Sequence, residues 1–81
     1  MTLKTGDLVY LPSEIMIFGS FDDSGMIRNW VNLDKPSYGL VIEANWGGEN
    51  IYHKVYTKGS NWFVRTIDAF RSYEKENKRN D

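Results

Sequence analysis

Alternation of apolar and polar residues marks the first β-strand of the chain. After a Gly-Asp turn, the segment LVYLP places Val9 and Leu11 on one side and Leu8 and Tyr10 on the other. This is the two-residue period of a strand. Pro12 cannot donate to a strand ladder, so the strand is expected to end there.

The segment from residue 38 to 65, YGLVIEANWGGENIYHKVYTKGSNWFVR, predicts a meander of three strands joined by two tight turns. A two-residue turn at 47–48 would pair Leu40 with Val55, and a type II′ turn at 59–60 would pair Val55 with Val64. A slip of one residue in either hairpin would break the agreement between them, because side chains alternate between the two faces. Both registers predict one inner face, which contains Leu40, Ile42, Ala44, Ile51, His53, Val55, Trp62 and Val64.

The outer face of the meander combines aromatic rings with charges. The predicted register sets Lys54 directly opposite Arg65, and like charges in that position destabilise a sheet unless a carboxylate or a bound anion compensates. Glu43 on the adjacent strand is the candidate carboxylate. The face is expected to carry Val41, Glu43, Tyr52, Lys54, Tyr56, Phe63 and Arg65.

Two segments outside the meander complete the predicted fold. Residues 12–35 are too apolar for a disordered linker and too broken by Gly, Asp and Asn for one long element, so we expect an ordered excursion with a short hairpin. After Arg65, the spacing of Ile67 and Phe70 predicts a single helical turn followed by an extended segment. An amphipathic helix from Ile67 to about Asn77 is the alternative. Residues 74–81, EKENKRND, are expected to form a solvated charged tail.

Composition and charge narrow the class of protein. A chain of 81 residues supports one core, so we expect a single domain at residues 1–73 followed by the tail. It contains no cysteine, which excludes disulfides and thiolate metal sites. The N-terminus has no basic segment followed by an apolar run, so we expect an intracellular, soluble protein without membrane contact. The net charge of −1 gives no whole-molecule attraction to nucleic acid.

The order of these segments resembles that of SH3-like barrels. KTGDLVYLP, YGLVIE and NWFVRTIDAF look like the start, middle and end segments of small SH3-like proteins encoded by tailed bacteriophages. The resemblance covers residues 4–11 and 38–73. It implies an all-β, partly open barrel of about five strands, with residues 12–35 as an insertion and a helical turn before the last strand. It also implies a non-enzymatic binding or assembly role, in the host cytoplasm if the protein is phage-encoded.

The outer face of the meander is the candidate binding surface. Its predicted binding residues are Trp46, Tyr52, Lys54, Tyr56, Lys58, Phe63 and Arg65. We expect a protein partner there, with Trp46 either anchoring the contact from its loop tip or folding back over the mouth of the barrel. The first loop lacks the ALYDY-type segment of peptide-binding SH3 domains, so the resemblance assigns no polyproline-binding residue.

Three alternatives remain for this face. Its rings and cations suit single-stranded nucleic acid, with bases stacked on rings and phosphates held by Lys or Arg. The same residue types are enriched in homo-oligomer interfaces. The third alternative is structural, because Phe18, Phe21 and Trp30 of the excursion are apolar enough to fold over the face as a second small core.

No sequence pattern indicates catalysis or metal binding. His53 is the only histidine and has no partner for a metal site or a catalytic triad, so we expect a structural role near the barrel end. The segment SFDDSGMIRNWV begins like a calcium loop, but Val31 stands where an acidic ligand is required. A turn in which Asp22 and Asp23 cap backbone groups is therefore expected. We predict no enzyme activity, no cofactor and no metal.

Overall fold

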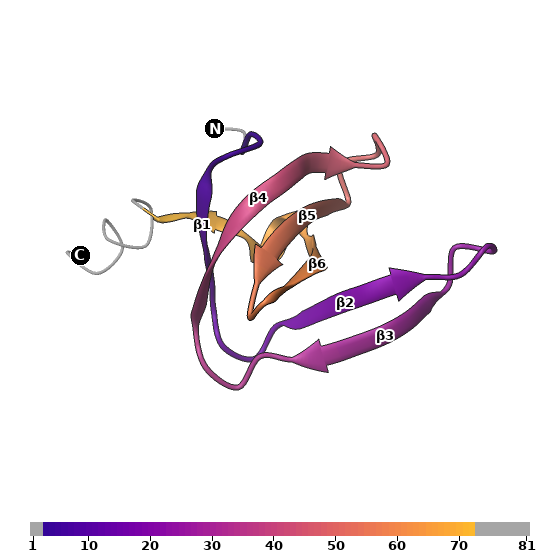
Figure 1. Cartoon of the computed structure of the whole chain (residues 1–81), viewed down its shortest axis with the longest axis horizontal. Helices are drawn as coiled ribbons and strands as arrows, with labels where there is room; N and C mark the ends of the chain where they lie inside the picture. Colours follow the sequence, from indigo (N-terminus) through magenta and orange to yellow (C-terminus); the bar gives the residue numbers. More distant parts are fainter. Residues whose placement is uncertain (1–2, 73–81) are drawn as a thin grey trace.

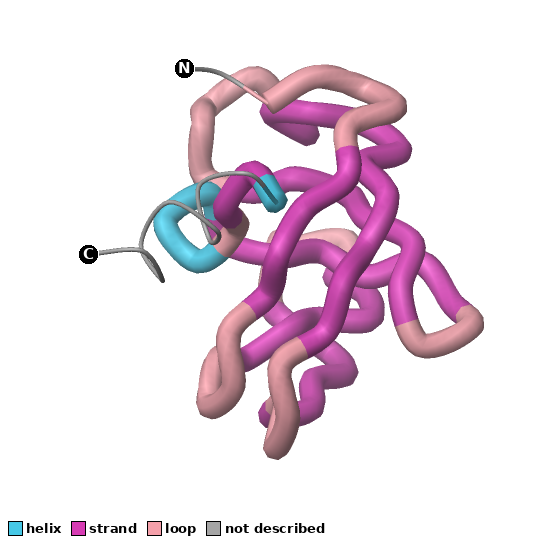
Figure 2. Tube along the Cα trace, turned by 90° about the vertical axis from the view of Figure 1, so that its left-hand side faces the viewer, coloured by secondary structure: helices cyan, strands magenta, loops and turns pink. Residues whose placement is uncertain are grey.

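The computed structural model describes residues 3–72, and its chain is all-β (Figure 1). Strands make up most of the described chain (Figure 2). The elements are β1 Leu8–Leu11, β2 Met16–Phe21, β3 Ile27–Asn32, β4 Ser37–Trp46, β5 Tyr52–Thr57, β6 Ser60–Arg65, the 3-10 turn η1 Thr66–Asp68 and β7 Phe70–Arg71. The strands form one antiparallel sheet in the order β3-β2-β6-β5-β4-β1-β7.

This arrangement confirms the all-β prediction, whereas the expected count of about five strands is too low. The difference arises in residues 12–35, because both arms of the excursion are strands of the main sheet. The charged tail predicted at 74–81 lies outside the described residues. Within residues 3–72, no helix is long and apolar enough to cross a membrane.

One hydrophobic core lies against the inner face of the sheet. It contains Leu3, Val9, Leu11, Ile15, Ile17, Leu33, Val41, Val55, Val64 and Ala69. β1 and β2 both contribute to it although β4, β5 and β6 separate them in the sheet. A flat sheet would hold β1 and β2 about 19 Å apart. The sheet must therefore curve around the core, and the bend of β4 is visible in Figure 1.

The predicted inner face is correct for β5 and β6. His53, Val55 and Val64 are buried, and Trp62 packs against the core. The predicted turn between these strands is nevertheless wrong, because the turn residues are Lys58 and Gly59, with φ of 52° and 80°. Positive φ at both central positions is the type I′ pattern, which matches the twist of the strands. The resulting shift of two residues in pairing leaves every side chain on its predicted face.

The predicted inner face is wrong for most of β4. Val41 is buried opposite Val55, whereas Leu40 and Ile42 are 44% and 38% exposed. A bulge between Val41 and Glu43 adds one residue to β4, so Val41 and Ala44, three positions apart, both reach the core. The predicted two-residue turn at 47–48 is replaced by a loop over 47–51, in which Ile51 is exposed rather than internal.

The two connecting segments follow their predictions more closely. Residues 12–35 contain the expected hairpin, β2–β3, and β2 also pairs with β6. The helical turn η1 and the short strand β7 confirm the predicted end of the fold. The alternative helix starting at Ile67 is wrong, because Ala69 is extended and Phe70 and Arg71 pair with β1.

Candidate functional site

Five aromatic rings from four strands meet on the outer face of the sheet and are named here the aromatic cluster: Phe18, Phe21, Trp46, Tyr52 and Phe63. The ring of Phe21 lies 5.4 Å from that of Trp46, 5.1 Å from Tyr52 and 5.0 Å from Phe63. Phe18 is buried and the other four are half-buried. Each such ring pair contributes about 0.5–1.5 kcal/mol beyond its buried area.

The cluster shows how far the excursion covers the predicted binding surface. Phe18 and Phe21 of β2 contact Tyr52, and Phe21 also contacts Phe63, so part of the predicted surface is a second small core. Trp30 does not join it: it lies opposite Phe18 in the β2–β3 ladder but is 55% exposed. The prediction that all three excursion rings cover the face is thus correct for two of them.

Trp46 belongs to the cluster rather than to the tip of a free loop. Its ring stacks on Phe21 at an interplanar angle of 12° and lies 4.5 Å from the ring of Phe63. Of the two predicted positions for this side chain, the folded-back one is closer to the structure. The ring reaches the outer face because a second irregularity in the β4–β5 register follows Glu43.

The predicted apposition of Lys54 and Arg65 is wrong. Because the turn is at 58–59, Lys54 faces Phe63 and Arg65 faces Tyr52. Lys54 Nζ lies 6.0 Å from the centroid of the Phe63 ring, within range of a cation–π contact. Arg65 Nε donates to Asp68 Oδ2 at 3.0 Å. The predicted binding residues include three cations, Lys54, Lys58 and Arg65, and two of them, Lys54 and Arg65, therefore already have partners.

Beside the aromatic cluster, the outer face carries a second set of apolar side chains, named here the open apolar face: Leu8, Tyr38, Leu40, Ile42 and Tyr56. Each is more than a third exposed, up to 52% for Leu8. Leu8 faces Leu40 across β1 and β4, and Leu40 faces Tyr56 across β4 and β5. Contiguous exposed apolar surface of this kind marks interaction sites more often than scattered single residues do.

Sequence reasoning found Tyr56 but missed the rest of the open apolar face. Strict alternation, extended through β4, predicts that Leu40 and Ile42 face the core. The run LVIEA has apolar residues at 40, 41, 42 and 44, so the sequence does not show which of these side chains face the core. That break in alternation is the signal for the bulge that the structure contains.

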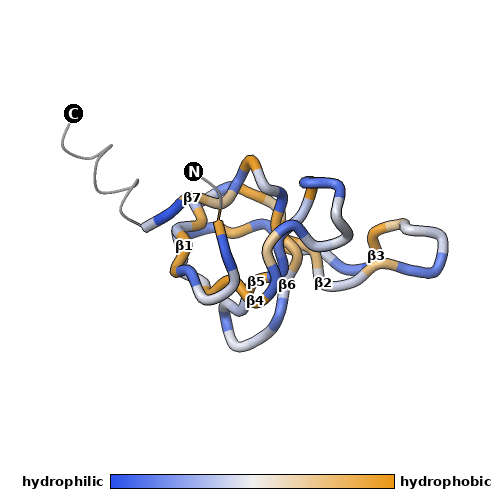
Figure 3. Tube along the Cα trace, turned by 90° about the horizontal axis from the view of Figure 1, so that it is seen from above, coloured by the Kyte–Doolittle hydropathy of each residue, from blue (hydrophilic) through white to orange (hydrophobic). Residues whose placement is uncertain are grey.

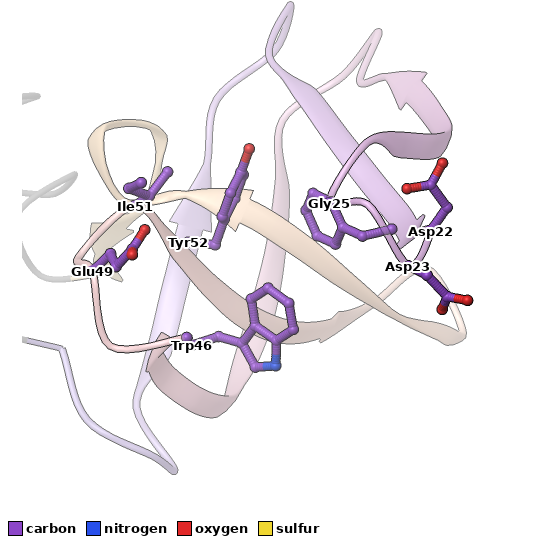
Figure 4. Close-up of a pocket in the computed structure, with 9 residues that line it drawn as sticks. Asp22, Asp23, Gly25, Trp46, Glu49, Ile51 and Tyr52 are labelled. Atoms are coloured by element: carbon purple, nitrogen blue, oxygen red, sulfur yellow. The ribbon is translucent and has the colours of Figure 1, made fainter.

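A shallow pocket of about 280 Å³ lies between the β2–β3 turn and the β4–β5 loop (Figure 4). Phe21, Trp46 and Tyr52 form its apolar wall together with Ile51. Its remaining lining residues are Asp22, Asp23, Gly25, Gly47 and Glu49. With three carboxylates and no basic residue in the described lining, the pocket has a negative potential that disfavours phosphate.

Asp22 holds the β2–β3 turn in place. Its Oδ1 accepts hydrogen bonds from the Ser24 hydroxyl at 2.7 Å and from the backbone N–H groups of Ser24 and Met26, both at 2.9 Å. These bonds, that from the Ser24 hydroxyl foremost, lower the pKa of Asp22 below its usual value. The predicted turn is confirmed with Asp22 as its backbone cap, whereas the prediction that Asp23 also caps backbone groups is wrong, because the described residues contain no hydrogen bond to its side chain. Residues 3–72 contain no group of three or more His, Cys, Asp or Glu side chains that could hold a metal ion.

His53 lies inside the molecule rather than at a binding surface. It is 5% exposed, and its Nδ1 accepts the backbone N–H of Asn45 at 2.9 Å. Burial lowers the pKa of His53 below 6.5, because the charged ring would lose its hydration. This geometry agrees with the structural role predicted for the residue.

The structure divides the predicted binding residues into two groups. The aromatic cluster contains Trp46, Tyr52 and Phe63, with Lys54 over the Phe63 ring and Arg65 opposite Tyr52. The open apolar face contains Tyr56, and Lys58 lies in the adjoining turn. No protein family, curated protein or solved structure matches the chain. The two surfaces described above are therefore the basis for a functional proposal.

Proposed function

We propose that this chain is a non-enzymatic binding module that holds a protein partner on the open apolar face. The observation that carries the proposal is the exposure of five large apolar side chains on three adjacent strands. Full burial of such a side chain contributes about 1.5–3 kcal/mol. Covering five that are about half exposed would therefore contribute on the order of 5 kcal/mol before the costs of association.

The proposed module is of the SH3-like type. The order of its elements supports this assignment: three consecutive antiparallel strands, β4 to β6, are followed by a helical turn and a last short strand that pairs with β1. The same resemblance supports a phage-encoded protein that acts in the host cytoplasm. The β2–β3 hairpin then corresponds to the elaborated first loop.

Charge distribution favours a protein partner over nucleic acid. Lys54 lies over Phe63 and Arg65 is paired with Asp68, so binding phosphate would require breaking existing contacts. The rings that would stack bases are packed against β2. The adjoining pocket is bordered by Asp22, Asp23 and Glu49, which would repel a phosphate backbone.

Photo-crosslinking tests this proposal directly. A photoreactive phenylalanine analogue replaces Tyr56, or Ile67 of η1 as an exposed apolar control. In extracts of the natural host, Tyr56 should give a discrete protein adduct that survives nuclease treatment, and Ile67 should not. An adduct that nuclease removes would favour nucleic acid, and a product of twice the chain mass would favour a homo-oligomer on this face. Equal labelling from both positions would contradict a specific surface.

A further inference from the structure

β3 lies at the open edge of the sheet. It is the terminal strand in the order of pairing, and all six of its residues are exposed. Within the β2–β3 hairpin, β2 packs against the rest of the sheet and β3 lies at the margin of the molecule (Figures 1 and 3). The opposite terminal strand, β7, is only two residues long. β3 therefore presents the longest unpaired strand edge in residues 3–72.

Hydrogen bonding at the end of β3 defines which backbone groups face that free edge. Leu33 N–H donates to the Ile15 carbonyl at 2.9 Å, and the Leu33 carbonyl accepts the Glu14 N–H at 2.6 Å. In an antiparallel ladder the direction of both groups alternates from one residue to the next. The N–H and C=O groups of Asn32 and Trp30 therefore point away from β2, toward the free edge.

The edge has few of the features that prevent strands from pairing. It contains no proline and a single charge, Arg28, and its exposed side chains include Ile27, Trp30 and Val31. Soluble proteins usually protect such edges with lysines, prolines or bulges. The register of β3 with β2 has two irregularities, one at Gly19 of β2 and one at Arg28 of β3. Both precede Trp30 along β3, so Trp30, Val31 and Asn32 pair regularly with β2.

We propose that β3 pairs antiparallel with β3 of a second copy of this chain, around a two-fold axis at Val31. Outward-facing residues must lie opposite one another in such a ladder, and this axis sets Trp30 opposite Asn32 of the second copy. Val31 then meets its own counterpart at the centre. The ladder has two hydrogen-bonded pairs, which are Trp30 with Asn32 of the second copy and the symmetry-related pair. Both lie in the part of β3 that pairs regularly with β2.

Charge complementarity selects this axis. Arg28 and Asp34 lie three positions before and after Val31, both are exposed, and neither forms an ion pair within residues 3–72. An axis at Val31 places the end of β3 that carries Arg28 beside the segment after β3 of the other copy, which carries Asp34, whereas an axis at Arg28 would oppose like charges. β2, β6 and β5 lie between β3 and β4, so a dimer through β3 leaves most of the open apolar face free. Two such faces would act together on a multivalent partner.

The absence of cysteine in the chain permits a direct test by single-cysteine substitution. With the axis at Val31, the two copies of that residue are directly opposite with Cα atoms about 4.5–5.5 Å apart, within disulfide range. The two copies of Asn29 would be roughly 13 Å apart, beyond it. Mild oxidation with oxidised glutathione should crosslink Val31→Cys at least about tenfold faster than Asn29→Cys. Equal rates, or a faster rate at Asn29→Cys, would overturn the proposed axis.

Sedimentation of the unmodified chain provides the second readout. We expect a concentration-dependent dimer that Asn32→Pro abolishes, because proline removes an outward N–H without removing a bond to β2. Trp30→Lys should have the same effect through edge protection, and both variants should keep the circular dichroism spectrum of the unmodified chain. A chain that remains monomeric at all concentrations would overturn the proposal. So would a dimer that persists in both variants but is lost in a Leu8→Ser/Leu40→Ser variant.

Discussion

At the scale of single residues, His53 ties the stability of the fold to pH. The ring must be neutral for Nδ1 to accept the Asn45 N–H, and burial lowers the pKa of His53 below 6.5. The unfolded chain then binds more protons than the folded chain as the pH falls through this range. The stability that depends on neutral His53 is complete above the unfolded pKa and is lost progressively below it.

A variant without a titrating side chain tests this dependence. In His53→Asn the amide oxygen can replace Nδ1 as acceptor for the Asn45 N–H, at the cost of some packing. Urea unfolding at about pH 7.5 and about pH 5.5 should show a larger loss of unfolding free energy in the unmodified chain than in the variant. The same loss in both would mean that His53 is not responsible.

Substitution of Val64, also a change at a single residue, tests which face of the sheet packs against the core. Its side chain is fully buried between the residues of β2 and β5, opposite Ile17 and His53. Val64→Asp buries an unpaired charge and should cost roughly 3 kcal/mol or more, enough to unfold a marginally stable domain. Lys54→Ala should leave the chain folded, because that side chain lies on the outer face. A folded Val64→Asp variant, judged by its circular dichroism spectrum, would contradict the assigned inner face.

At the scale of elements, the β5–β6 turn concentrates its strain in one residue. Lys58 adopts φ of 52°, a conformation that costs most non-glycine residues about 1–2 kcal/mol and that Asn tolerates better. Lys58→Asn should raise the unfolding free energy by about 0.5–1 kcal/mol. The matched control Lys54→Asn should lower it, because Asn is unfavourable within a strand. A loss of stability in both variants would place Lys58 in a strand, as a turn at 59–60 would require.

The elements also show what the sequence could and could not predict. The faces of β5 and β6 were predictable because each strand alternates without interruption, and a pairing error of two residues leaves faces unchanged. The face of β4 was not, because its bulge places both Val41 and Ala44 toward the core. The hairpin at 12–35 was predictable from local signals. Its pairing with β6 was not, since Phe18 and Phe63 are distant in sequence and no local pattern joins them.

At the scale of the whole molecule, the two ends of the sheet differ in how they are covered. Where β2 pairs with β6, both faces are packed: Ile17 belongs to the core, and the neighbouring Phe18 belongs to the aromatic cluster. Where β1, β4 and β5 pair, only the inner face is covered, and Leu8, Leu40 and Tyr56 remain exposed. The residues predicted to form a binding surface do share the outer face of the sheet, but the exposed apolar side chains of that face lie nearer β1 than the sequence indicated.

We propose that the open apolar face, rather than the cations beside it, binds the partner. The most direct measurement is the dissociation constant of the crosslinked partner, once purified, for the unmodified chain, Leu40→Ser and Lys54→Ala at two salt concentrations. We predict that Leu40→Ser weakens binding about tenfold or more, that Lys54→Ala changes it little, and that salt has a small effect. A large loss with Lys54→Ala and a steep decrease of affinity with salt, while Leu40→Ser binds normally, would contradict the claim.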